Sequence, residues 1–288
     1  MRILFCTDGS KISFNALKNF SHFAPQDAII DTICVIDWSF LPDDTAIEGS
    51  GFANSCRNIA DTILEQTKQL VEELGLRNGE QIKYCGAAVE SILEQLDENI
   101  YTYVILGSHG KKGLQRWLGS VSREILESTS VPVYISKERR ETKNILFTTD
   151  GSETSLRIAN DTIHKLNLSD CKIYICTVVE NPDLLFLDGT LDSNWMLAIQ
   201  AQQEIYSNHA IEKIRNFFEK NNLPIEDDRV LSGIPAQKIL NYATEQGIDL
   251  IIMGSKIKTK MQSFLLDSVS KRVIEHANCD TLVIKFKA

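Results

Sequence analysis

The sequence predicts an α/β protein made of two tandem α/β sandwich domains, each built around a five-stranded parallel sheet. Two observations predict this fold class: the chain repeats itself, and within each repeat short β-branched runs alternate with longer amphipathic segments. With 288 residues, 43% hydrophobic and 24% charged, the chain resembles an ordinary globular protein and is long enough for two domains. We expect these domains to span residues 1–137 and 143–288.

Three sequence blocks recur in the same order in the two halves. The paired blocks are residues 3–10 and 145–152, residues 103–108 and 250–255, and residues 120–123 and 268–271. In the first pair, Ile-Leu-Phe-Cys-Thr-Asp-Gly-Ser and Ile-Leu-Phe-Thr-Thr-Asp-Gly-Ser agree at seven of eight positions. The chain is therefore a tandem duplication, and we interpret the charged stretch 137–143 as the linker.

Strands and helices are expected to alternate within each half. In the first half, apolar and β-branched runs predict strands at about 2–7, 29–36, 80–85, 102–107 and 132–136. Apolar residues at helical spacing predict the helices between them, marked by Ala16, Phe20 and Phe23, by Ile59, Ile63, Leu70 and Leu74, by Ile92, Leu93 and Leu96, and by Val121, Ile125 and Leu126. The second half repeats the pattern, with Leu156, Ala159, Ile163 and Leu166 on one helix and Ile211, Ile214 and Phe218 on the next. We expect these stripes to form the core.

Composition excludes several classes of protein. No apolar run approaches the roughly 18 residues that a membrane span needs, and Asp8 interrupts the stretch where a signal peptide would be apolar. We therefore expect a cytoplasmic protein that does not cross a membrane. A net charge of -9 disfavours broad binding to nucleic acid. Small molecules or proteins are the expected partners.

Cysteine and histidine spacing argues against a metal centre. The seven cysteines form no C-x-x-C pair, and the five histidines show no H-x-x-x-H or H-E-x-x-H spacing. The sequence therefore predicts neither a disulfide framework nor a metal held by protein ligands alone.

Two turns follow predicted strands at the edge where open parallel sheets bind ligands. In the first, Cys6 to Ser10, Asp8 ends a strand and Ser10 can cap the next helix. Both residues could instead serve only to shape the turn, and the repeat at Thr149 to Ser152 does not distinguish the two interpretations, because both copies need the same turn.

The second turn, Gly107 to Ser120, holds four of the fifteen glycines. Such a loop before a helix can present bare backbone N–H groups to a phosphate. Ser120 and Ser122 could add hydroxyl donors, and further positive charge comes from Lys111, Lys112 and Arg116. A glycine-rich loop without a ligand is the open alternative.

Two other residues of the loop are not expected to act chemically. His109 has no nucleophile with a matching acid nearby in the sequence, which favours a backbone-shaping or solvent-facing histidine over a catalytic one. Trp117 is interpreted as a packing anchor.

At these residues the chain resembles the universal stress protein family, whose ATP-binding members carry the motif G-x2-G-x9-G-S/T. Gly107, Gly110, Gly119 and Ser120 match it, with eight residues instead of nine between the last two glycines. The resemblance covers essentially all 288 residues as two such domains in tandem, an arrangement that occurs in the family. It implies a Rossmann-like fold of the adenine-nucleotide alpha hydrolase type.

The resemblance also implies roles for individual residues. Thr7 and Asp8 would approach the adenosine, and Val35 would line the adenine pocket. Leu106, Gly107 and Ser108 would flank the nucleotide. The phosphates, with Mg²⁺ or Mn²⁺ on them, would be held by Gly110, Gly119, Ser120, Val121 and Ser122.

The second half breaks the motif. Ile257 and Asp267 stand where the second and third glycines belong, so a branched side chain and a carboxylate would oppose a phosphate there. We predict that this half does not bind ATP in the family manner. Its loop also carries Lys256, Lys258 and Lys260, interpreted as solubilising charges rather than a second anion site.

The leading functional hypothesis is a stress regulator whose first half binds ATP or another adenine nucleotide, with a structural or signalling second half. The chain lacks a G-x-x-x-x-G-K-S/T loop and a G-x-S-x-G elbow, so we predict no dedicated transfer or hydrolysis chemistry. A scaffold without nucleotide and a slow ATPase remain the alternatives. Family dimers pair through their last strands, here 131–135 and 281–285, which implies an internal pseudo-dimer about a pseudo-two-fold axis. A further homodimer stays open.

Overall fold

The computed structural model describes residues 1–37, 51–109, 118–138, 143–180, 193–260, 263–265 and 268–287. The strands are β1 (Arg2–Thr7), β2 (Ile29–Ile36), β3 (Arg77–Cys85), β4 (Tyr103–Gly107), β5 (Val133–Ser136), β6 (Asn144–Thr148), β7 (Lys172–Val179), β8 (Ile225–Ser232), β9 (Leu250–Lys260), β10 (Ser263–Leu265) and β11 (Asp280–Lys287). The helices are α1 (Lys11–Ser21), α2 (Gly51–Glu73), α3 (Ala88–Glu98), α4 (Ser120–Ser128), α5 (Glu153–Lys165), α6 (Ser193–Lys220), α7 (Pro235–Glu245) and α8 (Ser268–His276).

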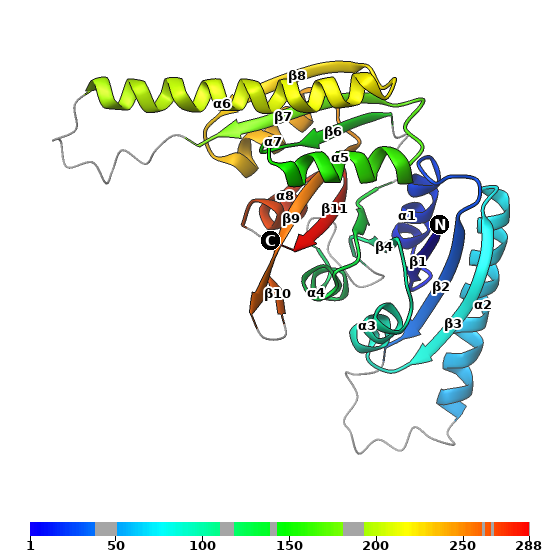
Figure 1. Ribbon diagram of the computed structural model, residues 1–288. Coiled ribbons are helices and arrows are strands. Elements are labelled where there is room, and N and C mark those ends of the chain that lie inside the picture. The colour runs from blue at the N-terminus through cyan, green and yellow to red at the C-terminus, as the bar shows by residue number, and fades with distance from the viewer. Residues whose placement is uncertain are drawn as a thin grey trace.

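One continuous sheet runs through both halves, with the strand order β3-β2-β1-β4-β5-β11-β9-β6-β7-β8 (Figure 1). Within each half these strands pair in parallel, as the alternation of strands and helices predicts. The halves meet where β5 and β11 pair antiparallel, with Tyr134 opposite Leu282. The predicted pairing of the last strands is therefore confirmed, and it gives each strand an inner neighbour instead of an open edge.

Helices cover both faces of the sheet. Phe20 of α1, Val71 of α2, Ile158 of α5 and Phe218 of α6 belong to one core cluster on the first face. Helices α3, α4, α7 and α8 pack on the opposite face, where a second cluster also draws residues from both halves. Along β1, successive side chains enter the two clusters in turn, as the two-residue period of a strand requires. The predicted apolar stripes are therefore core, except at Ile59 of α2, which is 50% exposed and belongs to none of the core clusters.

Two strands differ from the expected elements. Strand β3 begins at Arg77, three residues before the predicted start, because pairing with β2 extends it through the polar residues Arg77 to Glu80. Strand β9 continues past Gly254 to Lys260, where a loop was expected. It pairs with β11 as far as Ile257 and then forms an antiparallel pair with β10. Backbone pairing with neighbours thus decided both boundaries.

Reciprocal ion pairs join the helices α4 and α8 across the junction of the halves. Arg123 Nη2 lies 3.4 Å from Glu275 Oε1, and Lys271 Nζ lies 3.0 Å from Glu127 Oε1. Lys271 lies 148 residues after Arg123, and Glu275 lies 148 residues after Glu127. The two ion pairs are therefore equivalent positions of the repeat, related by the pseudo-two-fold symmetry. Lys285 of β11 adds hydrogen bonds from its Nζ to carbonyl oxygens at the end of α4.

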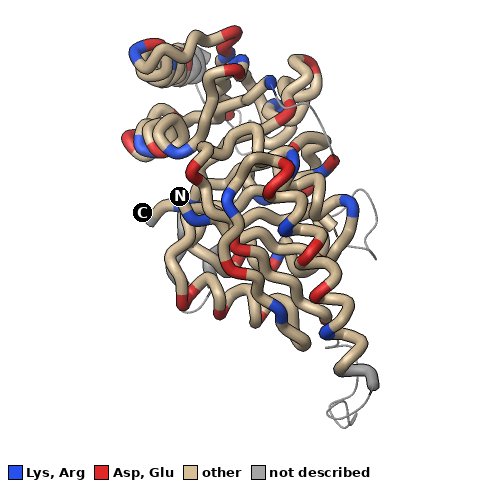
Figure 2. Tube along the Cα trace, turned by 90° about the vertical axis from the view of Figure 1, so that its right-hand side faces the viewer, with Lys and Arg blue, Asp and Glu red and all other residues tan. Residues whose placement is uncertain are grey.

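Charge is spread over the whole molecule. Figure 2 shows acidic and basic residues interspersed along both halves of the trace. No helix in the described ranges has the length and hydropathy that a membrane span requires.

Candidate functional site

The turn between β1 and α1 is held by its own polar side chains. Ser10 caps α1 as predicted, because its Oγ accepts a hydrogen bond from Ser13 N at 3.2 Å. Asp8 Oδ1 accepts from Ser10 N at 2.9 Å. Thr7 Oγ1 accepts from Gly9 N at 3.0 Å and lies 2.8 Å from Ser13 Oγ. Thr7 is buried and Asp8 is half-buried, so Asp8 presents the more accessible polar group.

Strand β4 and helix α4 are joined closely at the glycine-rich turn. Gly119 N donates to Ser108 O at 2.6 Å, and Ser122 Oγ donates to Gly107 O at 2.7 Å. The Ser122 hydroxyl therefore anchors α4 to β4, which competes with the predicted role as a phosphate donor. The backbone N–H groups of the first helical turn, Ser120 to Ser122, have no acceptor within the helix. These amides, with the exposed Ser120 side chain, form the polar end of α4.

The predicted site residues that the structure describes lie at one edge of the sheet. Strands β2, β1 and β4 are neighbours in that order, and they end at Ile36, Thr7 and Gly107. Val35 and Leu106 are buried there in the same core cluster. Val121 is half-buried at the start of α4. Gly110, Lys111, Lys112, Arg116 and Trp117 lie outside the described residues.

His109 is buried, with an exposed fraction of 9%. Its Nδ1 lies 3.0 Å from Ser108 Oγ, at hydrogen-bond distance. The solvent-facing alternative is therefore wrong, because the turn folds this ring back against Ser108. The contact agrees with a histidine that helps to shape the backbone.

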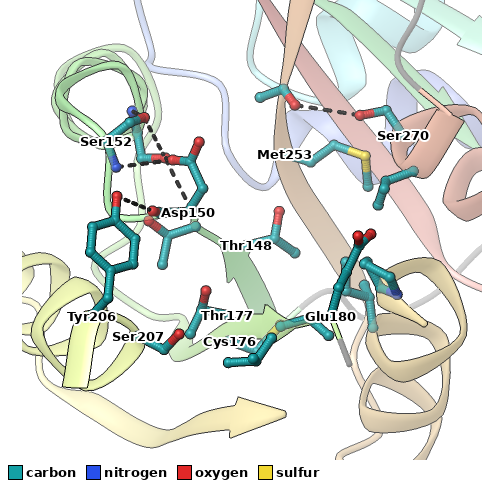
Figure 3. Close-up of a pocket in the computed structure, with 18 of the residues that line it drawn as sticks. Thr148, Asp150, Ser152, Cys176, Thr177, Glu180, Tyr206, Ser207, Met253 and Ser270 are labelled. Carbon is teal, nitrogen blue, oxygen red and sulfur yellow. Dashed lines mark hydrogen bonds between the residues drawn. The ribbon is translucent and has the colours of Figure 1, made fainter. Parts of the chain in front are cut away.

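The second half contains a cavity of about 720 Å³ at the carboxyl ends of β6, β7 and β9 (Figure 3). It occupies the same place in the repeat as the turns just described, and helix α6 supplies one wall. Asp150 lines it, and burial raises the pKa of this carboxyl. Hydrogen bonds from Ser152 and Ser155 outweigh that effect, so the pKa lies below its ordinary value. Asp150 is therefore ionised at neutral pH.

The wall residues from α6 were missed by the sequence interpretation. Gln203, Tyr206 and Ser207 line the cavity from α6, more than fifty residues after Asp150. A signal was present: these polar residues recur at spacings of three and four, on the helix face that continues with the buried Ala210 and Ile214. A polar interruption in an apolar stripe indicates a place where the helix does not pack directly on the sheet.

Of the other motif residues in the second half, Asp267 lies outside the described residues. Ile257, Lys256, Lys258 and Lys260 belong to β9, but their side chains also lie outside the described part.

Comparison with known proteins places both halves in the same family. A family model described as Universal stress protein family matches residues 1–137 and again residues 141–285. A universal stress protein of Methanocaldococcus jannaschii is 33% identical over 143 residues, which is 50% of this chain and 82% of that protein. A second one from the same organism is 29% identical over 157 residues, covering 50% of this chain and 96% of its own length.

Solved structures show the same fold over the whole chain. The crystal structure of a universal stress protein from Archaeoglobus fulgidus DSM 4304 covers 99% of this chain and 98% of its own, with a TM-score of 0.69 and 21% identity. A functionally unknown protein from Pseudomonas aeruginosa PAO1 covers 99% of this chain and 92% of its own, with a TM-score of 0.67 and 13% identity. The tandem arrangement is thus shared along the full length.

Proposed function

Since the chain belongs to the universal stress protein family, as two tandem domains, we propose that its first half binds ATP or a related adenine nucleotide. One observation carries the proposal. The described residues that the sequence predicts for the nucleotide site lie at the carboxyl ends of the adjacent strands β2, β1 and β4 and at the N-terminus of α4. That edge of an open parallel sheet is where nucleotides bind in this class of fold.

Each part of the nucleotide has a proposed partner. Asp8 reaches the adenosine, while Val35 and Leu106 form an apolar floor for the base. The N–H groups of Ser120, Val121 and Ser122 and the partial positive charge of the helix N-terminus hold the phosphates. Gly110 belongs to this phosphate loop by its place in the motif.

A divalent ion would come with the nucleotide. In the described part of the chain, no group of three or more His, Cys, Asp or Glu side chains could hold a metal. Mg²⁺ would therefore be bound mainly by the phosphates, where it neutralises their charge. All seven cysteines lie in the described part of the chain, and none of them is in a disulfide. This is the usual state in the reducing cytoplasm, and we propose that the protein acts there.

Isothermal titration calorimetry with Mg-ATP tests the proposal. We expect one nucleotide per chain, and we expect Gly110→Val to weaken binding about ten-fold or more, because a branched side chain blocks the close approach of the backbone to phosphate. Gly113→Val is the matched control, since Gly113 lies in the same loop but is not part of the motif. It should keep the affinity within about three-fold of the wild type.

Three outcomes would contradict the assignment. The wild type could give no heat of binding, in which case the scaffold alternative holds. Two nucleotides per chain would contradict the assignment to the first half alone. If the Gly110→Val and Gly113→Val variants bind Mg-ATP with equal affinity, the glycine-rich loop does not hold the phosphates.

A further inference from the structure

The cavity of the second half is not explained by a nucleotide site in the first half. Its volume of about 720 Å³ lies within the range of small-molecule sites. Ile239, Met253 and Val269 contribute to an apolar wall. The cavity therefore has room and a surface for the carbon skeleton of an organic ligand.

The charged side chains among the described lining residues are acidic. Among the described lining residues, Asp150 and Glu180 are acidic, and none is Lys, Arg or His. Figure 3 shows the two acidic side chains on opposite sides of the cavity, with Thr148 between them. Glu180 directly follows β7, and its side chain is exposed to solvent. A phosphate or carboxylate ligand would be repelled from both sides, whereas a cation would be attracted.

Several hydroxyl donors of the lining are already used within the protein. Ser155 Oγ donates to Asp150 Oδ1 at 2.5 Å, and Tyr206 Oη donates to the Asp150 carbonyl at 3.4 Å (Figure 3). Ser270 Oγ donates to Gly254 O at 3.4 Å.

One acceptor of the lining differs from these donors because the described part of the chain gives it no partner. Gln203 Oε1 is buried and has no hydrogen-bond partner among the described residues. A buried acceptor of this kind costs free energy until a donor reaches it. Among the described lining residues, Gln203 therefore offers one acceptor that lacks a donor, which favours a ligand with N–H donors.

We propose that this cavity binds a small organic amine in its protonated form, whose N–H donors meet the carboxylate and amide oxygens while its apolar body lies against the aliphatic wall. Binding at this site is separate from nucleotide binding in the first half. The second half is then a binding domain whose ligand has the opposite charge to a phosphate.

Three probes that share one ring and differ in one terminal group test the proposal: tyramine, the neutral alcohol tyrosol and 4-hydroxyphenylacetate. Titration calorimetry uses the full chain at neutral pH and low salt. For probes of this size, we expect tyramine to bind with a dissociation constant on the order of 1 mM. Tyrosol should bind at least about five-fold more weakly, and 4-hydroxyphenylacetate should give no saturable heat.

Two variants that have the same net charge test whether tyramine binds in the cavity. Glu180→Gln removes an exposed carboxylate of the cavity and should weaken tyramine binding about five-fold or more, without loss of the fold. Glu245→Gln removes an exposed carboxylate that does not line the cavity. Glu245 is the last residue of α7, whereas Pro235, the first residue of the helix, lines the cavity. It should keep the affinity within about two-fold, because a distant surface charge is screened. Tyramine binding should also persist in Gly110→Val.

The proposal is overturned if tyramine shows no saturable binding, or if 4-hydroxyphenylacetate binds as tightly as tyramine. It is also overturned if Glu180→Gln and Glu245→Gln bind tyramine equally. Because no nucleotide is present in this experiment, its failure would leave the ATP proposal untouched.

Discussion

Replacement of Asp280 by alanine is expected to lower the free energy of unfolding by about 4 kcal/mol, because it leaves several buried donors without an acceptor. Asp280 is 1% exposed at the start of β11. Its carboxylate accepts hydrogen bonds from Tyr134 Oη at 2.5 Å, Asn19 Nδ2 at 2.9 Å and Lys137 N at 2.8 Å. These three donors belong to the first half, so the variant removes the polar centre of the junction.

The Tyr134 hydroxyl keeps its proton in this network. Burial and the neighbouring Asp280 raise the pKa of Tyr134 well above its ordinary value, so the hydroxyl remains a donor. In Asp280→Ala, this hydroxyl and the Lys137 amide would face a methyl group. Water cannot easily replace the lost acceptor at a site with so little exposure.

Asp249→Ala is the control for Asp280→Ala. The Asp249 carboxylate also accepts from two backbone amides, Lys143 N at 3.1 Å and Asn144 N at 3.0 Å, but it is only half-buried. Water can satisfy these amides, so we expect a loss of about 1 kcal/mol. Urea denaturation followed by circular dichroism measures both values. A loss in Asp280→Ala no larger than that in Asp249→Ala would contradict the assigned importance of the junction.

Gly151→Ala is expected to cost about 3 kcal/mol, the sum of backbone strain and overpacking. Gly151 has a φ of +73°, which L-residues with a side chain rarely adopt. A Cβ at this position would overlap the Cβ of Ala210 and lie 2.9 Å from its Cα, so helix α6 would have to move. Because α6 also forms a wall of the cavity, the variant should loosen that site as well.

Gly75→Ala separates the two causes. Gly75 has nearly the same φ, +71°, but a Cβ there would meet nothing within 4 Å. The substitution therefore carries the backbone strain alone and should cost about 1 kcal/mol. Urea midpoints of the two variants provide the comparison. Equal losses would show that the contact between Gly151 and α6 adds nothing.

Much of the fold could be predicted because its causes are local and repeated. Short apolar, β-branched runs and apolar residues at helical spacing predicted strands and helices that the structure contains, and the match of residues 3–10 with 145–152 predicted the duplication. The capping role of Ser10 was also predictable, since a cap depends on residues within one turn. Boundaries were less predictable where pairing partners decided them, as at Arg77 and Lys260.

The candidate site and the polar network of the junction also differ in how far the sequence could predict them. The motif glycines, Asp8 and Ser120 could be proposed as site residues from the sequence, because they lie in one short segment or at the end of a predicted strand. The polar network of Asp280 could not, because Asn19 and Tyr134 reach it only after β5 and β11 have paired. The hydrogen bond from the Ser122 hydroxyl to Gly107 O could not be predicted either, because it depends on where α4 lies against the end of β4.

By itself, the sequence determined that this is a duplicated α/β protein with one motif-bearing half and one half that lost the motif, because repeats and periodicity are properties of neighbouring residues. Only the tertiary structure decided that the altered half still has a cavity and that this cavity is acidic. Asp150, Glu180 and Gln203 come from separate segments and share a space only after α6 has folded over β6 and β7. The acidic charge of Asp150 and Glu180 and the unpartnered acceptor of Gln203 share one space because of that arrangement, not because of any one segment.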